Sequence, residues 1–324
     1  MKPGSEVEIL LATFNGERFL RQQIDSLLNQ DYQNIRVLAR DDGSSDGTMA
    51  VLREYAELFP EKFRLLVTEA STSHPKWNFL ELLKTSTADY ICLSDQDDVW
   101  LPFKVRSEKQ AMDQLERRYG PQVPLLVFSD LRIVDESLKE LDSSFWKRNR
   151  IRPESIHRLQ VLLGQNVLTG CTAMLNRKLV ELSLRMPEEA QMHDRWIALL
   201  AASMGKSLAL PQQTVLYRQH QNNVIGSRRE DDSIARIVRQ ARNSENRLKE
   251  WRVSQRQAEA LLRLHGEQLD PKRQALLQQY RLCGQSKSRF VRLFKIIRYG
   301  FFRGGLLQTV ATVWDLWNLK KADN

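Results

Sequence analysis

The sequence is poor in cysteine and has no long uninterrupted apolar segment. Its three cysteines lie far apart among 324 residues and form no CxxC pair. Zinc sites and disulfide frameworks are therefore not indicated, and we expect reduced thiols in a cytoplasmic protein. No segment approaches the roughly 18–20 uncharged apolar residues of a membrane span. At the N-terminus, Asn15 and Glu17 interrupt the apolar run at once, which predicts a strand and no signal peptide.

Glycine-rich phosphate loops are also absent. No GxGxxG follows the first apolar run, which disfavours a dinucleotide-binding fold, and no GxxxxGK[ST] occurs. The segment 42–47 resembles the start of an EF-hand loop. Arg53, however, stands where such a loop needs a bidentate Glu.

The charge is plentiful but unevenly distributed. The chain carries a formal net charge of +9, and 42% of its residues are hydrophobic, enough for a substantial core. From Lys287 to the end there are eight Lys/Arg and two Asp, so this segment contributes 8 − 2 = +6. A basic tail predicts an anionic partner.

The apolar pattern divides the chain into two parts. Up to residue 226, short apolar runs alternate with amphipathic helical patterns, which is typical of an α/β domain with a mainly parallel sheet and flanking helices. Residues 227–324 are polar, charged and helical, with a break at HGEQLDPKR that predicts a hairpin. The expected strands are Val7–Thr13, Ile35–Ala39, Phe63–Thr68, Tyr90–Ser94, Leu125–Ser129, Thr172–Leu175, Ser207–Leu210 and Thr214–Arg218. The expected helices in the first part are Glu17–Leu28, Thr48–Leu58, Trp77–Lys84 and Lys104–Arg118.

Two acidic clusters follow expected strands directly. The sequence DDGSSDGT begins at Asp41 after IRVLAR, and DQDD begins at Asp95 after YICLS. In a parallel sheet both clusters lie at the same edge, where carboxylates repel one another unless a cation or donors compensate them. Mg²⁺ and Mn²⁺ use one or two carboxylates together with substrate phosphate oxygens. The pattern therefore anticipates a metal that bridges the protein and a diphosphate.

Each cluster also has a simpler interpretation. DGSSDGT can be only a turn whose Thr48 begins the next helix, and DQDD can be a solvated loop. Asp95-x-Asp97 after an apolar strand also fits an aspartyl-phosphate phosphatase, although that hypothesis leaves the first cluster unexplained.

Together the motifs resemble the family 2 inverting glycosyltransferases of the GT-A fold. The resemblance covers about residues 6–226 and runs from ILLATFNGE through DDGSSDGT and YICLSDQDD to HDRW and YRQHQNN. It implies that Thr13, Phe14 and Asn15 line the pocket for base and ribose. Asp42 would accept a hydrogen bond from the imide of a uracil or thymine ring. The donor would thus be a UDP- or dTDP-sugar.

The resemblance also implies a metal site. Asp95 would reach the ribose or the metal, and Asp97 would ligate Mn²⁺ or Mg²⁺ on the diphosphate; the sequence does not separate Asp98 from Asp97. Arg218 and His220 are two residues apart, so they share one face of a strand. Arg218 would donate to the diphosphate, and His220 would be a further metal ligand.

The family expects a general base ahead of a helix in the second half, and Asp194 in MHDRW matches it, with His193 in place of the usual Glu. An inverting transfer needs a carboxylate to take the proton of the acceptor hydroxyl, and His193 would assist. Asp194 could instead only cap the helix, whose N-terminus would lower the pKa of an acid.

The segment from HDRW onward looks especially like enzymes that transfer rhamnose or a related deoxysugar in bacterial surface polysaccharide synthesis. One departure is the loop after the third strand, which lacks the family's Asn-x-Gly. Lys76 and Asn78 are its remaining candidates for donor contacts. A non-catalytic nucleotide- or carbohydrate-binding module on the same fold is the main alternative.

The basic tail has two interpretations. Acceptors of the family are often lipid-linked sugars, so an amphipathic basic-aromatic helix suits peripheral binding at the inner face of a membrane. Alternatively, its apolar side chains pack on the catalytic domain or on another subunit; these are Phe290, Leu293, Phe294, Ile297 and Phe301. Nucleic-acid binding is not expected, because no nucleic-acid module is recognisable.

Overall fold

The computed structural model describes residues 5–68, 71–220, 244–286 and 288–302, together with Val313, Trp314 and Trp317; for residues 244–247 it describes the backbone alone. The strands are β1 (Val7–Thr13), β2 (Ile35–Asp41), β3 (Phe63–Leu66), β4 (Tyr90–Ser94), β5 (Val99–Trp100), β6 (Leu125–Val134), β7 (Glu140–Asp142), β8 (Ala173–Asn176) and β9 (Lys206–Arg218). The helices are α1 (Glu17–Leu28), α2 (Thr48–Leu58), α3 (Pro75–Thr85), α4 (Lys104–Tyr119), α5 (Phe145–Arg148), α6 (Leu159–Leu162), α7 (Arg177–Ser183), α8 (His193–Met204), α10 (Ser244–His265), α11 (Pro271–Gln285) and α12 (Arg289–Tyr299).

These strands form one mixed sheet in the order β3-β2-β1-β4-β8-β6-β9-β5, with β7 beside β6. Neighbouring strands are parallel from β3 to β4 and again between β6 and β9. β8 runs antiparallel to both of its neighbours, β4 and β6. The prediction of a mainly parallel sheet is confirmed, and the carboxyl ends of β1, β2 and β4 meet at one edge.

The two strands expected over Ser207–Leu210 and Thr214–Arg218 are in fact the single strand β9. Its pairing with β6 shifts from Ser129 opposite Leu210 to Asp130 opposite Gln213, so Pro211 and its neighbour bulge out of the ladder. Proline has no N–H to donate, which confines it to such irregular positions. The separation into two strands is therefore wrong, because a bulge in a paired strand looks like a turn in the sequence.

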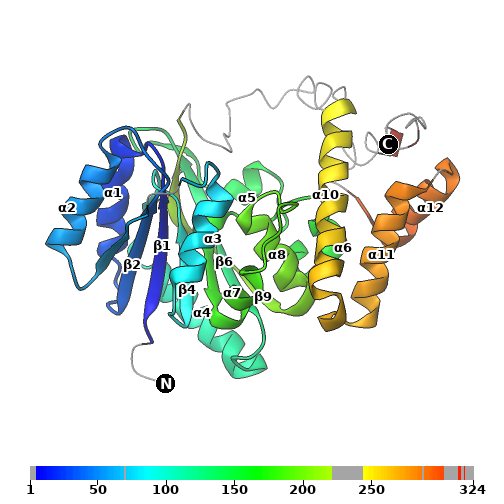
Figure 1. The fold of residues 1–324 in the computed structure, drawn as a ribbon, viewed down its shortest axis with the longest axis horizontal. Coiled ribbons are helices and arrows are strands. Elements are labelled where there is room, and N and C mark those ends of the chain that lie inside the picture. Colours follow the sequence, from blue (N-terminus) through cyan, green and yellow to red (C-terminus); the bar gives the residue numbers. More distant parts are fainter. Residues whose placement is uncertain are drawn as a thin grey trace.

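Helices cover both faces of the sheet. In β1, Ile9 and Leu11 face the layer of α1, α2 and α4, whereas Leu10 faces the layer of α3, α7 and α8. Alternate side chains of a strand point to opposite faces, so a continuous apolar run fits a sheet that is buried on both sides. The layers are drawn in Figure 1.

The C-terminal helices share the core of the α/β part. α10 and α11 form the expected hairpin, since the chain breaks after His265 and Asp270 caps α11 by accepting from the Arg273 N–H. Trp251 of α10 and Tyr280 of α11 are buried in the same apolar cluster as Trp196 of α8. Figure 1 shows these helices at the end of the molecule opposite α1 and α2. The expected boundary at residues 226–227 lies outside the described residues.

None of the helices in the described ranges combines the length and apolar character that a membrane crossing would need.

Candidate active site

The turn after β2 is built around Asp41. Its carboxylate accepts from the Thr13 hydroxyl at 2.9 Å and from the backbone N–H groups of Gly43 and Ser44 at 3.1 and 2.7 Å. Gly43 has a φ of +89°, a conformation that glycine adopts without strain. Thr13 is only 1% exposed, so its hydrogen bond to Asp41 links the ends of β1 and β2 inside the protein.

Phe14 and Asn15 lie on the outer side of the same edge. The Phe14 ring is 55% exposed, and the Gln96 side chain pairs with its backbone N–H and C=O at 2.7 and 2.9 Å. The Asn15 N–H donates to Ser44 Oγ at 2.7 Å, and the Asn15 side-chain Oδ1 accepts from the Ser45 N–H at 2.8 Å. An exposed aromatic ring on a backbone that is held by hydrogen bonds can stack against a planar ligand.

Asp42 is buried beside a cation. Its Oδ1 accepts from Arg40 at 2.9 Å and from the backbone N–H and hydroxyl of Thr72 at 2.6 and 2.9 Å. Arg40 also donates to Asn78, whose amide in turn donates to the carbonyl oxygen of Thr13. Asn78 therefore braces β1 and β2.

The loop after β4 holds the acidic cluster. One oxygen each of Asp95 and Asp98 and the sulfur of Cys171 lie within 4.8 Å of one another. Asp98 is fully buried; its Oδ1 accepts from the Arg218 N–H at 3.2 Å, and its Oδ2 has no hydrogen-bond partner. Burial and the nearby charges of Asp97 and Asp95 raise the pKa of Asp98 well above its ordinary value. Burial, with the charges of Asp97 and Asp194 adding to it, raises the pKa of Asp95 to about 7.

Arg218 and His220 both meet Asp97. The Arg218 Nε donates to the Asp97 carbonyl oxygen at 2.8 Å, and the His220 Nε2 lies 2.7 Å from Asp97 Oδ2. Both side chains lie near the ring of Phe19, at 4.5 Å for the guanidinium and 5.2 Å between the rings. The remaining guanidinium nitrogens of Arg218 donate to the Glu136 carbonyl oxygen and to Gln22. Arg218 thus holds the acidic loop in place.

This donor set suits a hard divalent cation. Carboxylate oxygens and an imidazole are present, and the buried Asp98 Oδ2 lacks a partner that would compensate its charge. Burial and the Asp98 charge raise the pKa of Cys171, so its thiol stays protonated and is a poor ligand for such an ion.

Asp194 lies in the first turn of α8 and is 6% exposed. Its Oδ1 accepts from the Arg195 N–H at 2.6 Å, and its Oδ2 accepts from the Asn166 amide at 3.0 Å. Burial nevertheless raises the pKa of Asp194 to about 6, so the expected lowering by the helix N-terminus does not prevail. A carboxyl with this pKa can act as a general base near neutral pH.

His193 packs beside Asp194 as a neutral ring. It stacks on Phe79 with the ring centroids 3.9 Å apart, and a Cβ added to Gly170 would lie 3.0 Å from its Nε2. Burial lowers the pKa of His193 to about 3, and neither ring nitrogen has a hydrogen-bond partner. Such an imidazole is a weak proton acceptor, which favours a packing role over assistance in proton transfer.

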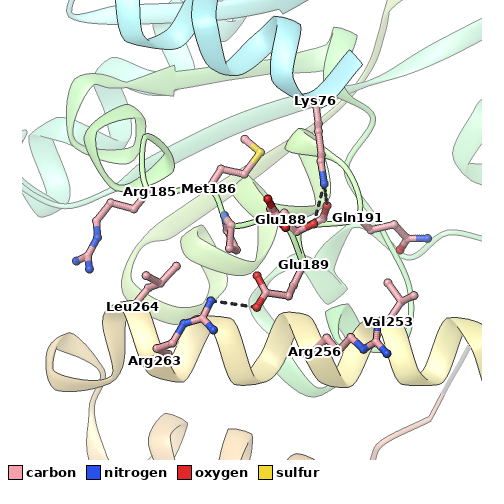
Figure 2. A pocket seen from close by; sticks show the side chains of 12 residues that line it. Lys76, Arg185, Met186, Glu188, Glu189, Gln191, Val253, Arg256, Arg263 and Leu264 are labelled. Atoms are coloured by element: carbon pink, nitrogen blue, oxygen red, sulfur yellow. Dashed lines mark hydrogen bonds and ion pairs between the residues drawn. The ribbon is translucent and has the colours of Figure 1, made fainter. Parts of the chain in front are cut away.

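The segment that leads into Asp194 is held from two sides (Figure 2). The Lys76 ammonium of α3 donates to the carbonyl oxygens of Glu188 and Ala190, each at 2.8 Å. From α10, Gln257 accepts from the Gln191 N–H at 3.1 Å. A cleft of about 880 Å³ lies between this segment and α10, and neither the acidic loop after β4 nor Asp194 lines it. Lys76 thus anchors the segment that leads into Asp194.

The structure brings most of the predicted site residues to one edge of the sheet, and it adds two residues, Asn166 and Gln96. Asn166 and Gln96 were not predicted as site residues, because each acts on a residue far away in the chain. No motif in the sequence marks Asn166, and Gln96 lies in the DQDD motif, which was interpreted through its carboxylates alone.

The sequence comparisons agree with this geometry. Residues 8–182 match the family described as "Glycosyl transferase family 2". The chain is 26% identical over 228 residues to the dTDP-rhamnosyl transferase RfbG of Shigella flexneri, covering 67% of this chain and 74% of that protein. It is 31% identical over 141 residues to the putative glycosyltransferase EpsE of Bacillus subtilis, covering 41% of this chain and 48% of that protein.

Solved structures with a similar fold are glycosyltransferases. S. aureus TarS 1-349 in complex with UDP-GlcNAc aligns over 96% of this chain and 89% of its own, with a TM-score of 0.54 and 12% identity. The mannosyltransferase PcManGT from Pyrobaculum calidifontis, in complex with GDP-Man and Mn²⁺, aligns over 97% and 88%, with a TM-score of 0.51 and 15% identity. At such identities these neighbours show the fold, which is GT-A. Because the family match spans more than half of the 324 residues, the chain belongs to glycosyl transferase family 2.

Proposed function

We propose that this glycosyltransferase inverts the anomeric centre of a UDP- or dTDP-sugar and transfers the sugar to a glycan or lipid-linked acceptor. The observation that carries the proposal is that Asp194 and the acidic loop share one site. A Cβ added to Gly170 would lie 3.5 Å from the Asp194 Cβ, and the sulfur of the next residue, Cys171, lies within 4.8 Å of oxygens of Asp95 and Asp98. Such a transfer requires a general base for the acceptor hydroxyl. It also requires an acidic cluster that can hold the metal ion bound to the diphosphate of the donor.

The donor would lie along the edge formed by β1, β2 and β4. The exposed Phe14 ring and the neighbouring Asn15 would line the pocket for the nucleobase and ribose. The buried Thr13 would stabilise this edge through its hydrogen bond to Asp41. Asp42 would accept from the base, which is why a uracil or thymine ring is proposed. The name of RfbG, a dTDP-rhamnosyl transferase, supports a dTDP-sugar with a rhamnose-like group. A cell-surface polysaccharide is the product that we propose from the resemblance of the segment after HDRW.

Asp95, Asp97 and His220 would hold Mn²⁺ or Mg²⁺. When bound, such an ion would neutralise charge on the departing nucleoside diphosphate. Arg218 keeps the loop in position through the carbonyl oxygen of Asp97. The Mn²⁺ in the PcManGT complex supports the choice of metal.

Asp194 would supply the base. Its carboxylate would take the proton of the acceptor hydroxyl while that oxygen bonds to the anomeric carbon and the bond from this carbon to the diphosphate oxygen breaks on the opposite face. The product therefore has the inverted configuration. The three free cysteines favour a reducing compartment, so we place the reaction in the cytoplasm.

The first test measures thermal stability with UDP, dTDP, GDP and ADP, each with and without Mn²⁺. A ligand at about a hundred times its dissociation constant stabilises the folded state by roughly 2.7 kcal/mol. We expect a metal-dependent rise in Tm with UDP or dTDP, which the Asp42→Asn substitution reduces. No rise in Tm with any nucleotide at high concentration would contradict the proposed donor site. A rise with GDP alone would contradict the proposed uracil or thymine ring of the donor.

A further inference from the structure

The outer face of α12 is apolar and open to solvent. Phe290, Phe294 and Ile297 are 74%, 63% and 62% exposed. Residues spaced by four and three positions lie on one face of a helix, so the three side chains form a continuous stripe. The Phe290 ring also meets the ring of Trp317 at 5.2 Å, which adds an aromatic group beside the stripe.

The opposite face of α12 is fixed to the rest of the protein. Ile296 is 2% exposed and Arg292 is 5% exposed, and the Cys283 thiol of α11 donates to the carbonyl oxygen of Arg292. After the helix, Phe301 is buried against Tyr280 with the ring centroids 4.9 Å apart. The tail residues therefore divide between the two expected roles, because some pack on the protein and others face away from it.

Positive charge surrounds the stripe. Arg289 and Arg298 are exposed within α12, one on either side of the apolar residues. Between Pro271 and Trp314 the sequence contains nine Lys/Arg and no Asp or Glu. An apolar stripe with cationic flanks is the pattern of a helix that lies in the interface of a membrane.

This charge pattern also selects among partners. A second copy of the chain that docked stripe against stripe would place the cations of one helix opposite those of the other, which costs free energy. An anionic lipid surface matches both features, since its acyl region accepts the rings and its headgroups accept the cations. We propose that α12 docks this enzyme on an anionic lipid surface, with the stripe Phe290, Phe294 and Ile297 inserted.

Vesicle flotation of the full chain tests the proposal. The probes are vesicles of phosphatidylcholine alone and vesicles that also contain phosphatidylglycerol. The variant Phe290→Ser/Phe294→Ser removes two rings of the stripe. The matched control Leu58→Ser/Val67→Ser changes two apolar side chains that are 62% and 70% exposed at the far end of the molecule. Thermal melting establishes that both variants are folded.

We expect the wild type and the control to float with the anionic vesicles, less so as salt is raised, and to remain unbound with phosphatidylcholine alone. The stripe variant should bind the anionic vesicles at least about tenfold more weakly. Failure of the folded wild type to bind anionic vesicles would overturn the proposal, as would equal binding of the stripe variant. Sedimentation that shows a dimer in the wild type and a monomer in the stripe variant would assign the stripe to self-association instead.

Discussion

At the scale of single residues, Asp194 as the proposed base sets the pH dependence that we expect of the reaction. Burial raises its pKa to about 6, and the carboxylate must be ionised to accept a proton. At a saturating Mn²⁺ concentration, which would keep Asp95 ionised, we therefore expect kcat/KM to be constant above about pH 7 and to fall as pH drops through the pKa of Asp194. Release of the nucleoside diphosphate measures the rate. Asp194→Asn should lower the rate by roughly 10²–10⁴ and leave the nucleotide-induced rise in Tm intact. Undiminished turnover of this variant would remove Asp194 as the base.

Asn166 positions this carboxylate. Its Oδ1 accepts from the Leu168 N–H at 3.1 Å, which turns its amide nitrogen toward Asp194 Oδ2 at 3.0 Å. Because this bond stabilises the ionised carboxylate, Asn166→Ala should raise the pKa of Asp194 and move the acidic limb of kcat/KM to higher pH. The rate on the alkaline plateau should change less.

The control for Asn166 is Asn149→Ala, since Asn149 also donates its amide to the protein, but to the Phe145 carbonyl oxygen and not to Asp194. It should leave the pH profile unchanged. A profile of Asn166→Ala that superimposes on that of the wild type would show that the bond does not tune the base.

At the scale of the element, α4 contains a fully buried ion pair. The Lys104 ammonium lies 2.7 Å from both oxygens of Glu108 and 4.1 Å from the centre of the Trp100 ring. Both side chains are 0% exposed. Removal of one partner leaves an unpaired buried charge, so Lys104→Met should reduce the free energy of unfolding by about 3–5 kcal/mol. Denaturant titration measures this loss.

A double variant separates the contribution of the ion pair to stability from the cost of leaving one charge buried without its partner. Lys104→Met/Glu108→Leu should recover most of the stability, because apolar side chains of similar volume replace both charges. The exposed pair Lys178–Glu181 in α7 gives the comparison, and Lys178→Ala there should cost at most about 0.5 kcal/mol. Equal losses at the two sites would contradict the role of burial.

The elements that could be predicted are those whose own apolar residues repeat with the period of a helix or form a short apolar run. The bounds of α1, α2, β1 and β4 agree with the prediction, and α4 ends at Gly120, whose φ is +86°. α3 begins two residues earlier than expected because Pro75 occupies its first turn and His74 caps it. The continuity of β9 could not be predicted, since it depends on its pairing with β6.

At the scale of the whole molecule, the C-terminal helices and the α/β part should unfold together. Trp251 is 3% exposed and packs against Tyr280, with the ring centroids 4.9 Å apart, in the cluster that also contains Trp196. Trp251→Ala should cost about 3–5 kcal/mol and leave one cooperative transition in a thermal melt. Phe290→Ala, which removes a 74% exposed ring, should change the stability by no more than about 0.5 kcal/mol. Two separate transitions would contradict a shared core.

The acidic part of the site could be predicted because parallel strands bring their carboxyl ends together. This rule places Asp42 and Asp95 at one edge without knowledge of any side-chain contact. The surroundings of Asp194 could not be predicted in this way. Asn166 reaches it from a loop and Lys76 fixes the segment before it, and both contacts depend on how distant parts of the chain pack.

The three cysteines have a consequence for chemical labelling. Cys92 and Cys171 are buried in the apolar cluster on one face of the sheet and Cys283 in the cluster on the other. Burial raises the pKa of each thiol, to about 11 for Cys283. Alkylating reagents attack the thiolate, so the native enzyme should react slowly, and each modified sulfur reports that the protein has opened around it. The rate at which each of the three cysteines is alkylated therefore reports how often the structure around it opens. Cys171 reports this for the acidic loop, because its sulfur lies within 4.8 Å of oxygens of Asp95 and Asp98.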